Sequence, residues 1–559
     1  MDGAKKVGNC RRSAGLRQCF RGAAMKAPSL LRSMLSFSAM TFISRLLGLV
    51  REMAIAYAFG ANAITDAFWV AFRIPNFMRR LFAEGSFSTA FVPVFTEVKE
   101  KRSHAELKEL VARVAGTLGS VLLIVTALGV LGSDWLTAGF SPGAFDEPEK
   151  FRLTSDLLRI TFPFLLFVSL TALAGGVLNS FHRFALPAIT PVVLNLCMIA
   201  AALWAAPHFD VPIMALGWSI LVAGILQLLL QFPALAKLDL LAMPRWGWRH
   251  ADVQRILKLM LPTLFGSSIA QINLLLDTLI ASFLIAGSQT WLAQTDRLLE
   301  FPLGVFGVAL GTVILPSLSR HHVTTDREGF SKALDWGLRT ALLISVPAMF
   351  GLVILAKPIM ATLFQHGRFS PHDVDMAALS LSALSLGLPA FALVKVVAPA
   401  FYARQDTRTP VRAGVVAMIA NMVMNVLFVG VLFALWHRPE QLSGGWLTAI
   451  ARVPGLHMGL ALASTLASYL NLVQLWRALQ REGIFVRQPG WAAHLLRLAV
   501  ASAALTLVLI VAVVYWPDWS AWSNLTRVMR LAAVIGVASA VYVVVLFATG
   551  FRMKDLRGI

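Results

Sequence analysis

The chain has 559 residues, of which 57% are hydrophobic and only 14% are charged, with a mean hydropathy of +0.71. A typical soluble domain has about 25% charged residues, well above the fraction in this chain. A soluble fold could not bury the hydrophobic surface that this composition implies. The formal net charge is +20, but the basic residues lie in short segments between hydrophobic runs, which fits membrane topology and not nucleic-acid binding. We therefore predict an all-α polytopic membrane protein with no nucleic-acid partner.

Fourteen hydrophobic segments along the chain are predicted to form transmembrane helices. A helix of about 20 residues crosses a hydrocarbon core of about 30 Å. Several segments are longer, so these helices are expected to tilt or to extend beyond the membrane. The predicted spans are residues 30–59, 64–95, 107–140, 153–181, 185–206, 211–236, 253–286, 289–318, 331–364, 373–402, 410–435, 447–477, 491–516 and 524–549.

The segments between the predicted spans alternate in charge. One set, which includes both termini, is rich in lysine and arginine, and the opposite set is poor in both. Cytoplasmic loops of membrane proteins carry an excess of these residues, so both termini are predicted to be cytoplasmic. The segments that contain neither lysine nor arginine are residues 60–65, 207–212, 286–290 and 516–523.

A weak internal repeat divides the chain. Pro93 and Pro316 are separated by 223 residues, and so are Pro187 and Pro410. Each repeat would hold six helices, and because six is an even number the two halves would have the same orientation in the membrane. The predicted units are a basic cytoplasmic tail at residues 1–29, an N-lobe at 30–240, a C-lobe at 241–482, and two further helices with a short cytoplasmic tail at 483–559.

Charged residues are concentrated in the first, second and eighth predicted helices. A charge at membrane depth costs roughly 2.5–3.5 kcal/mol on insertion scales and usually faces a cavity or a partner. In the second helix, Pro75 also predicts a kink or a break. The polar and charged residues are Arg45 and Arg51 in the first helix; Asp66, Arg73, Asn76, Arg79, Arg80 and Glu84 in the second; and Asp296, Arg297 and Glu300 in the eighth.

Two interpretations of these charges are open. Arg45, Arg79 and Arg297 suit a ligand, because arginine cannot lose its proton to lower the cost of burial. Arginines exceed carboxylates in the first two helices, and a guanidinium group binds phosphate oxygens in bidentate fashion, so the pattern favours a cavity for a phosphate-containing anion. Internal ion pairs are the alternative for the residues that have a partner of opposite charge nearby, namely Arg80, Glu84, Asp296 and Glu300.

A second polar group is predicted around Asp277 in the seventh helix. Asn421 and Asn425 lie four residues apart, on one face of the eleventh helix. If the two helices meet, one carboxylate and two amide oxygens would suit a hard cation such as Na⁺. Hydrogen bonds between the helices are the alternative. The sequence has no GxxxxGK[ST] motif and no catalytic constellation, so neither an enzyme activity nor a further cofactor is predicted.

Four stretches of the sequence are distinctive: SRLLGLVREMAIAYAFGANAITDAFWVAFRIPNFMRRLFAEGSFSTAFVPVF, DRLLEFPLGVFGVALGTVILPSLS, QHGRFS and VKVVAPAFYARQDTRTPV. Through these stretches the chain closely resembles the MurJ/MviN family of lipid II flippases, from about Leu30 to its C-terminus. The resemblance implies the MATE-like fold of the MOP superfamily, with two six-helix lobes around a central cavity and two additional helices. It places the essential cavity arginines of the family at Arg45, Arg51, Arg79 and Arg297, and it also matches Asp66 and Glu300. Asp277, Asn421 and Asn425 look similar to part of a sodium site in some relatives.

The resemblance implies a transporter, not an enzyme. The expected activity is translocation of lipid II, the undecaprenyl-diphosphate-linked peptidoglycan precursor, from the cytoplasmic to the periplasmic leaflet of the bacterial inner membrane by alternating access. Membrane phospholipid and the cell-wall synthesis machinery are the further expected partners, with Na⁺ or the membrane potential as driving force. The alternatives are a cation-coupled multidrug exporter, a flippase for another lipid-linked saccharide, and a scaffold for cell-wall enzymes.

Overall fold

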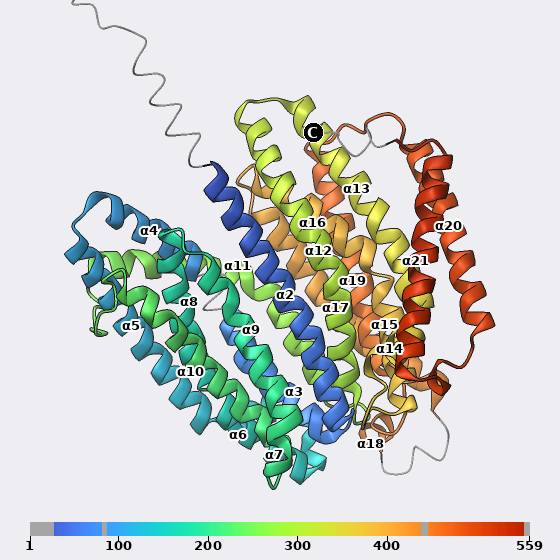
Figure 1. Cartoon of the computed structure of the whole chain (residues 1–559), viewed down its shortest axis with the longest axis horizontal. Coiled ribbons are helices and arrows are strands. Elements are labelled where there is room, and N and C mark those ends of the chain that lie inside the picture. The colour runs from blue at the N-terminus through green and yellow to red at the C-terminus, as the bar shows by residue number, and fades with distance from the viewer. Residues whose placement is uncertain (1–26, 81–86, 438–444, 553–559) are drawn as a thin grey trace, which may run out of the picture.

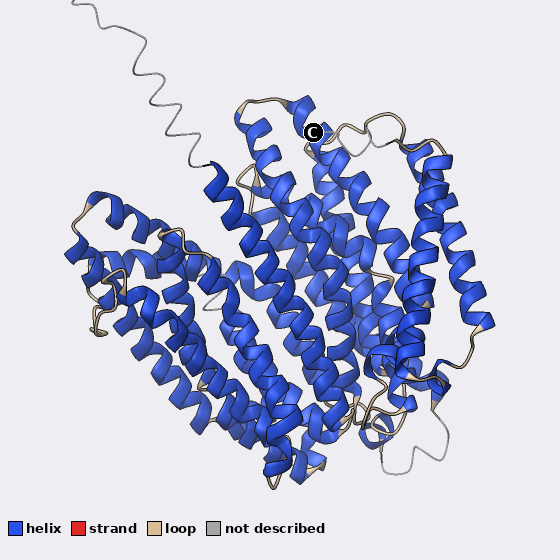
Figure 2. Ribbon diagram, viewed as in Figure 1, coloured by secondary structure: helices blue, strands red, loops and turns tan. Residues whose placement is uncertain are grey.

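The computed structural model describes residues 27–80, 87–437 and 445–552, and this part of the chain is helical, without strands (Figure 2). Glu84, a candidate site residue, lies outside the described residues. Figure 1 shows the first half of the chain, in blue and green, beside the second half, in yellow and red. The two ends of the described chain lie at the same end of the helix bundle, as an even number of membrane crossings requires.

The helices follow one another with short connections. The first half contains α2 (Ala27–Phe59), α3 (Ala63–Arg79), α4 (Ser88–Lys101), α5 (His104–Leu131), α6 (Ser133–Phe140), α7 (Pro148–Thr161), α8 (Phe164–Ser180), α9 (Ala185–Ala200) and α10 (Met214–Ala236). The second half contains α11 (Ala251–Ala281), α12 (Ser288–Val323), α13 (Arg327–Ile354), α14 (Ala356–Phe364), α15 (Pro371–Ser385), α16 (Leu388–Tyr402), α17 (Arg408–Trp436), α18 (Trp446–Ile450), α19 (His457–Arg481), α20 (Trp491–Tyr515) and α21 (Asn524–Ala548).

Each predicted transmembrane segment contains one helix or two helices in series. Within the described residues, nine helical segments are long and apolar enough to cross a membrane, or ten if the bent pair α15 and α16 forms one span. The axes of that pair meet at 40°. The prediction of an all-α polytopic membrane protein is confirmed, and the count of fourteen spans stays a prediction.

The second predicted helix consists of α3 and α4. The sequence predicts a kink or a break at Pro75, but α3 continues through this residue to Arg79. A proline has no N–H group, so it leaves the carbonyl four residues earlier, that of Ala71, without its helical hydrogen bond. The hydroxyl of Thr161 in α7 donates to this carbonyl at 3.1 Å. This bond satisfies the released carbonyl, so the helix continues in apolar surroundings.

The same arrangement recurs at Pro347 in α13. This proline releases the carbonyl of Leu343, which accepts a hydrogen bond from the hydroxyl of Tyr542 in α21 at 2.7 Å. An unpaired carbonyl in an apolar interior costs free energy, on the order of a few kcal/mol. The bond therefore stabilises α13 and also joins it to one of the two additional C-terminal helices.

Helix α11 packs against both halves of the molecule. Its first turns contribute Val253 and Ile256 to a hydrophobic core formed mainly by α4, α5 and α8. Farther along, α11 packs on α17. The first turns of α11 thus pack on helices of the first half of the chain, and the lobe boundary at residue 241 stays a prediction. The helix therefore connects the two halves of the chain.

Candidate functional site

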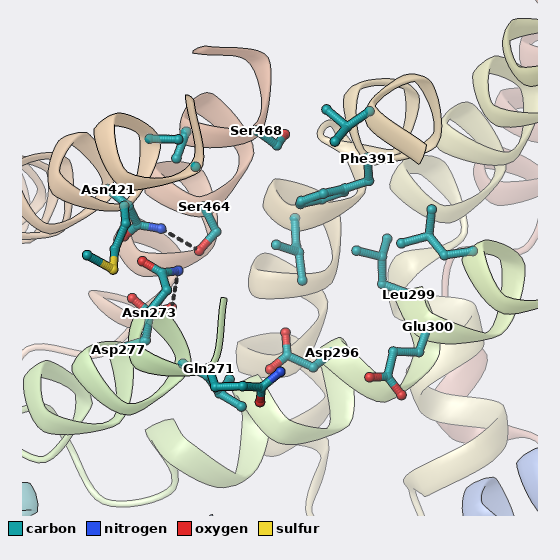
Figure 3. Close-up of a pocket in the computed structure, with 18 of the residues that line it drawn as sticks. Gln271, Asn273, Asp277, Asp296, Leu299, Glu300, Phe391, Asn421, Ser464 and Ser468 are labelled. Carbon is teal, nitrogen blue, oxygen red and sulfur yellow. Dashed lines mark hydrogen bonds between the residues drawn. The ribbon is translucent and has the colours of Figure 1, made fainter. Parts of the chain in front are cut away.

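A cavity of about 710 Å³ is lined by residues of both halves of the chain. Its wall includes parts of α2, α3, α11, α12, α16, α17 and α19, and it carries both polar and apolar side chains (Figure 3). The charged, amide and serine residues of the wall are Glu52, Arg73, Asn76, Arg80, Gln271, Asn273, Asp277, Asp296, Arg297, Glu300, Lys395, Asn421, Ser464, Ser468 and Asn471.

Most of the residues predicted from the sequence meet at this cavity. Those that line it are Arg73, Asn76, Arg80, Asp277, Asp296, Arg297, Glu300 and Asn421. Those that do not belong to its lining are Arg45, Arg51, Asp66, Arg79 and Asn425. Arg45, Arg51, Arg79 and Asn425 contact lining residues directly, whereas Asp66 lies elsewhere.

Three basic side chains from three helices converge on one part of α12. Nη1 of Arg45, from α2, donates to the backbone carbonyl of Glu300 at 3.2 Å. Nζ of Lys395, from α16, donates to the backbone carbonyl of Leu303 at 3.2 Å. Arg297 forms an ion pair with the side chain of Glu300, with 3.2 Å between Nη1 and Oε2. Arg45, Arg297, Lys395 and Glu300 are termed the basic cluster, whose three positive charges and one negative charge give a formal net charge of +2.

Two glycines hold the arginines of the basic cluster between α2 and α12. A Cβ atom at Gly48 of α2 would overlap Nη2 of Arg297, and a Cβ atom at Gly304 of α12 would overlap Nη1 of Arg45. Each guanidinium group therefore lies against the backbone of the opposite helix, at a position where a larger residue would displace it. Both groups lie where the first half of the chain meets the second.

Two other arginines of the wall bond to neutral acceptors. Nη1 of Arg73 donates to the hydroxyl of Thr278 at 2.6 Å. Nη1 of Arg80 donates to Oε1 of Gln271 at 3.3 Å. Neutral acceptors orient each guanidinium group without cancelling its charge, but the carboxylate of Asp296 is close enough to interact electrostatically with both arginines.

Arg51 and Arg79 lie outside the cavity wall. Arg51 is buried, forms an ion pair with Glu52, and donates to Oδ1 of Asn195 at 3.1 Å. Nε of Arg79 donates to Oδ1 of Asn76 at 3.0 Å. The contacts of Arg51 are those of an internal ion pair, which is the alternative interpretation of charges in these helices.

The charged side chains of the wall are balanced in number. They are Arg73, Arg80, Arg297 and Lys395 against Glu52, Asp277, Asp296 and Glu300. The surplus of arginine in the first two predicted helices is therefore not a property of the wall, because Arg45, Arg51 and Arg79 lie outside it. The polar groups are instead separated: Figure 3 shows Asp277 with Asn421 and Ser464 on one side and Glu300 on the other.

Asp277 lies among amide side chains, and the seventh and eleventh predicted helices do meet. Its Oδ1 accepts a hydrogen bond from Nδ2 of Asn425 at 2.7 Å, and Nδ2 of Asn421 donates to Oγ of Ser464 at 3.2 Å. The Oδ1 atoms of Asn273, Asn421 and Asn425 are buried and have no hydrogen-bond partner among the described residues. Buried carbonyl oxygens near a carboxylate fit a hard cation such as Na⁺. No cluster of three or more His, Cys, Asp or Glu side chains suited to a metal occurs within the described ranges.

Asp66 joins the two halves of the chain at the end of the bundle opposite the termini. Its carboxylate accepts hydrogen bonds from the backbone N–H groups of Gly287 at 2.7 Å and Thr290 at 2.9 Å, and from the hydroxyl of Thr290 at 2.7 Å. These N–H groups lie at the start of α12, where a helix leaves its donors unpaired and favours a negative charge. Asp66 therefore caps a helix of the other half of the chain.

Two further contacts join the halves at this end. The N–H group of Arg368 donates to the carbonyl of Tyr57 at 3.0 Å. The N–H group of Gly143 donates to Oγ of Ser282 at 3.1 Å. Together with Asp66, these contacts hold the two halves together at the end opposite the termini.

Lys395, Gln271 and Asn471 line the cavity but are not predicted from the sequence. Lys395 could have been predicted, since it is a single lysine in the apolar run FALVKVVAPAF. An ionisable residue within a membrane span is by itself a candidate for function. Neutral amides such as Gln271 cost less to bury, so they give a weaker signal.

The chain is similar to known lipid II flippases over almost its whole length. The family model described as lipid II flippase MurJ matches residues 55–437. A probable lipid II flippase MurJ from Vibrio cholerae is 44% identical over 537 residues, which cover 94% of this chain and 98% of that protein. The lipid II flippase MurJ from Burkholderia cenocepacia is 39% identical over 539 residues, covering 95% of this chain and 99% of that protein.

Solved structures have the same fold. A lipid II flippase MurJ in an inward-closed conformation gives a TM-score of 0.71 at 26% identity, covering 90% of this chain and 98% of that structure. An inward-facing MATE transporter of the MOP superfamily gives a TM-score of 0.60 at 12% identity, covering 80% of this chain and 98% of that structure. The second likeness concerns the fold alone, and with the first it confirms the predicted MATE-like architecture.

Proposed function

The chain belongs to the MurJ family of lipid II flippases, and we propose that it flips lipid II with the diphosphate of the substrate held by the basic cluster. It is a multi-pass membrane transporter of peptidoglycan biosynthesis and not an enzyme. The proposal concerns which residues bind the substrate and how the two halves of the chain move around it.

The convergence of Arg45, Arg297 and Lys395 on α12 is the observation that carries the proposal. A lipid-linked diphosphate carries about two negative charges, which the formal charge of the basic cluster would neutralise, and guanidinium groups bind phosphate oxygens in bidentate fashion. Arg45 belongs to the first half of the chain and the other two residues belong to the second half. A bound diphosphate would therefore contact both lobes, and its affinity would depend on their relative position.

Asp66 has a gating role in this proposal. Its hydrogen bonds to Gly287 and Thr290 would have to break before the cavity could open at that end of the bundle. Each such bond contributes roughly 1.5–3 kcal/mol when one partner is charged, and water replaces it when the end opens. The closed and open states would then differ by an energy that substrate binding can supply.

The distribution of basic loops supports an orientation with both termini in the cytoplasm. The end joined by Asp66 would then face the periplasm, and the cavity would load from the cytoplasmic leaflet. Moving about two negative charges outward is favoured by roughly 4–5 kcal/mol per 100 mV when the cell interior is negative. Arginines that move with the substrate would reduce this contribution.

Na⁺ is the second proposed ligand. Asp277 would hold it together with the buried amide oxygen of Asn421, and with that of Asn425 once this amide turns its oxygen, in place of Nδ2, toward the carboxylate. A cation there would neutralise the carboxylate and would favour close packing of α11 on α17. Because α11 also packs in the core of the N-lobe, cation binding would be coupled to the arrangement of the lobes. Cell-wall synthesis enzymes stay predicted partners.

Binding measurements on the purified protein in lipid nanodiscs test the substrate site. The Arg45→Ala and Arg297→Ala variants should each bind lipid II about tenfold or more weakly than wild type, because each loses a charged hydrogen bond. Exposed Arg327, at the start of α13, provides the control, and Arg327→Ala should bind normally. Undiminished binding by an Arg45→Ala/Arg297→Ala double variant would rule out the diphosphate site.

A further inference from the structure

The segment at residues 237–250, between α10 and α11, presents a stacked pair of tryptophans to the exterior. The rings of Trp246 and Trp248 lie 6.2 Å apart with an interplanar angle of 12°. Trp246 is 59% exposed, and Met243 nearby is 86% exposed. Arg245 and Arg249 flank the pair and are also exposed. Exposed aromatic and apolar side chains beside basic residues are typical of segments that lie in a membrane–water interface.

The backbone of this segment is held in place on the N-lobe. Leu240 is fully buried in the core formed mainly with α4, α5 and α8. The N–H group of Arg245 donates to the carbonyl of Ala112 in α5 at 2.9 Å, and the N–H group of Gly247 donates to Oγ1 of Thr117 at 3.0 Å. The exposed side chains are therefore presented by a fixed backbone, which lowers the entropy cost of binding.

The contacts with α5 indicate how deep the tryptophan pair lies in the membrane. Arg113 is the last charged residue of α5, and residues 114–131 contain none. The segment touches α5 at Ala112 and Thr117, about 7.5 Å apart along the helix at 1.5 Å per residue. Farther along, Leu123 and Leu128 are 58% and 65% exposed, as expected for side chains that face lipid. The tryptophan pair thus lies where the apolar part of the helix begins.

We propose that Trp246 and Trp248 insert into the interfacial layer of the adjacent leaflet and that Arg245 and Arg249 bind the headgroups of acidic phospholipids. The charges present on this surface favour an anionic partner. On α5, Glu109 accepts a hydrogen bond from Nη2 of Arg113 at 2.6 Å, so this neighbouring carboxylate is already paired. Each arginine near an anionic surface contributes about a fivefold increase in membrane affinity.

The location of the segment gives the interaction a consequence for transport. Residues 237–250 lead directly into α11, the helix that packs on both lobes. Acidic lipid bound here would fix the start of α11 relative to the bilayer while the lobes move. The proposal is independent of which leaflet faces the cytoplasm and of where lipid II binds.

Tryptophan quenching by brominated lipids tests the proposal on the full chain. The protein is reconstituted into phosphatidylcholine vesicles that contain either brominated phosphatidylglycerol or brominated phosphatidylcholine. The signal of the pair is the difference between wild type and a Trp246→Phe/Trp248→Phe variant, which keeps the aromatic packing. A second variant, Arg245→Gln/Arg249→Gln, removes the basic groups, and Arg477→Gln/Arg481→Gln, exposed on α19, is the control.

Stronger quenching by the acidic bromolipid, lost in Arg245→Gln/Arg249→Gln and kept in the control, is the expected result. Equal quenching by both lipids would overturn the acidic-lipid site and leave an unselective membrane anchor. Absence of quenching by either lipid would overturn the proposal entirely and would make this surface one that binds another protein.

Discussion

Nη2 of Arg297 in α12 occupies the space that a Cβ atom at Gly48 of α2 would fill. The reciprocal contact, between Arg45 of α2 and Gly304 of α12, lies farther along the same pair of helices. The two helices belong to different halves of the chain. Side-chain volume at these glycines is therefore linked to the position of the arginines proposed to bind the diphosphate.

Gly48→Ala should strongly reduce flippase activity without unfolding the protein. The added methyl group would displace the guanidinium group of Arg297, and a misplacement of about 1 Å at a binding site can reduce activity roughly a hundredfold. Activity is measured by complementation in cells depleted of their own flippase. Gly351→Ala in α13 is the matched control, because a Cβ there would meet no atom within 4 Å; normal activity of Gly48→Ala would contradict this packing argument.

Lys395→Met should weaken lipid II binding by about tenfold, since it removes a charged donor while keeping a side chain of similar length. The loss should be larger for undecaprenyl diphosphate than for undecaprenyl phosphate, because the second phosphate adds the charge that the basic cluster neutralises. Binding of both ligands to the purified variant is the measurement. An equal loss for both would show that Lys395 does not contact the diphosphate.

Asp66→Ala should favour the state that is open at the end opposite the termini. The substitution removes the charged hydrogen bonds to the start of α12, and the loss of even one such bond, about 1.5–3 kcal/mol, shifts the equilibrium by roughly ten- to 150-fold. Distances between spin labels on the two halves at that end would report the shift. Exposed Asp146 lies at the same end, and Asp146→Asn should leave the distances unchanged.

Tyr542→Phe should lower the thermal stability of the protein, because the carbonyl of Leu343 would lose its hydrogen bond beside Pro347. The expected cost is about 1–3 kcal/mol in the free energy of unfolding, with transport retained at moderate temperature. Tyr515→Phe is the control, since Tyr515 is 76% exposed.

Thr161→Val should also lower the thermal stability, because the carbonyl of Ala71 in α3 would lose its hydrogen bond. If Tyr542→Phe, Thr161→Val and Tyr515→Phe were equally stable, this explanation of the helix prolines would be contradicted.

Na⁺ should raise the melting temperature of the purified protein, and K⁺ at the same concentration should not. The reason is that a ligand which binds only the folded state stabilises it by mass action. Asp277→Asn should abolish the difference between the two ions, because the carboxylate supplies the charge of the proposed site. A difference that persists in this variant would place the Na⁺ effect elsewhere.

Hydropathy predicted the helices but not their partners. Arg45, Arg73, Arg297 and Glu300 are conspicuous in the sequence because charge in an apolar run is rare and costly. Their depth in the membrane follows from their position in the run, whereas the side chains that face them depend on how distant helices pack. Asp277 and Asn425 are separated by 148 residues. The sequence therefore predicts a shared site only if the seventh and eleventh helices meet, and it does not show whether they do.

Asp66 shows most clearly that a sequence does not reveal the partners of a buried charge. In the sequence it resembles the other charges of the second helix, and a place in the substrate site is a reasonable prediction. In the structure its partners are backbone N–H groups more than 220 residues away, and backbone groups leave no trace in a sequence. The roles of Gly48 and Gly304 are equally hidden in the sequence. A glycine in a membrane helix has several uses, and only the packed structure shows which arginine it accommodates.

The most direct test of the diphosphate site is the accessibility of lipid II on each leaflet in cells that depend on this protein. With Arg45→Ala/Arg297→Ala present in the membrane at wild-type abundance, lipid II should accumulate on the cytoplasmic side and should stay inaccessible from the periplasm. The corresponding lysine variants should restore part of the flipping, because they keep the charge and lose the guanidinium fork. Wild-type periplasmic accessibility with the double alanine variant would contradict the account.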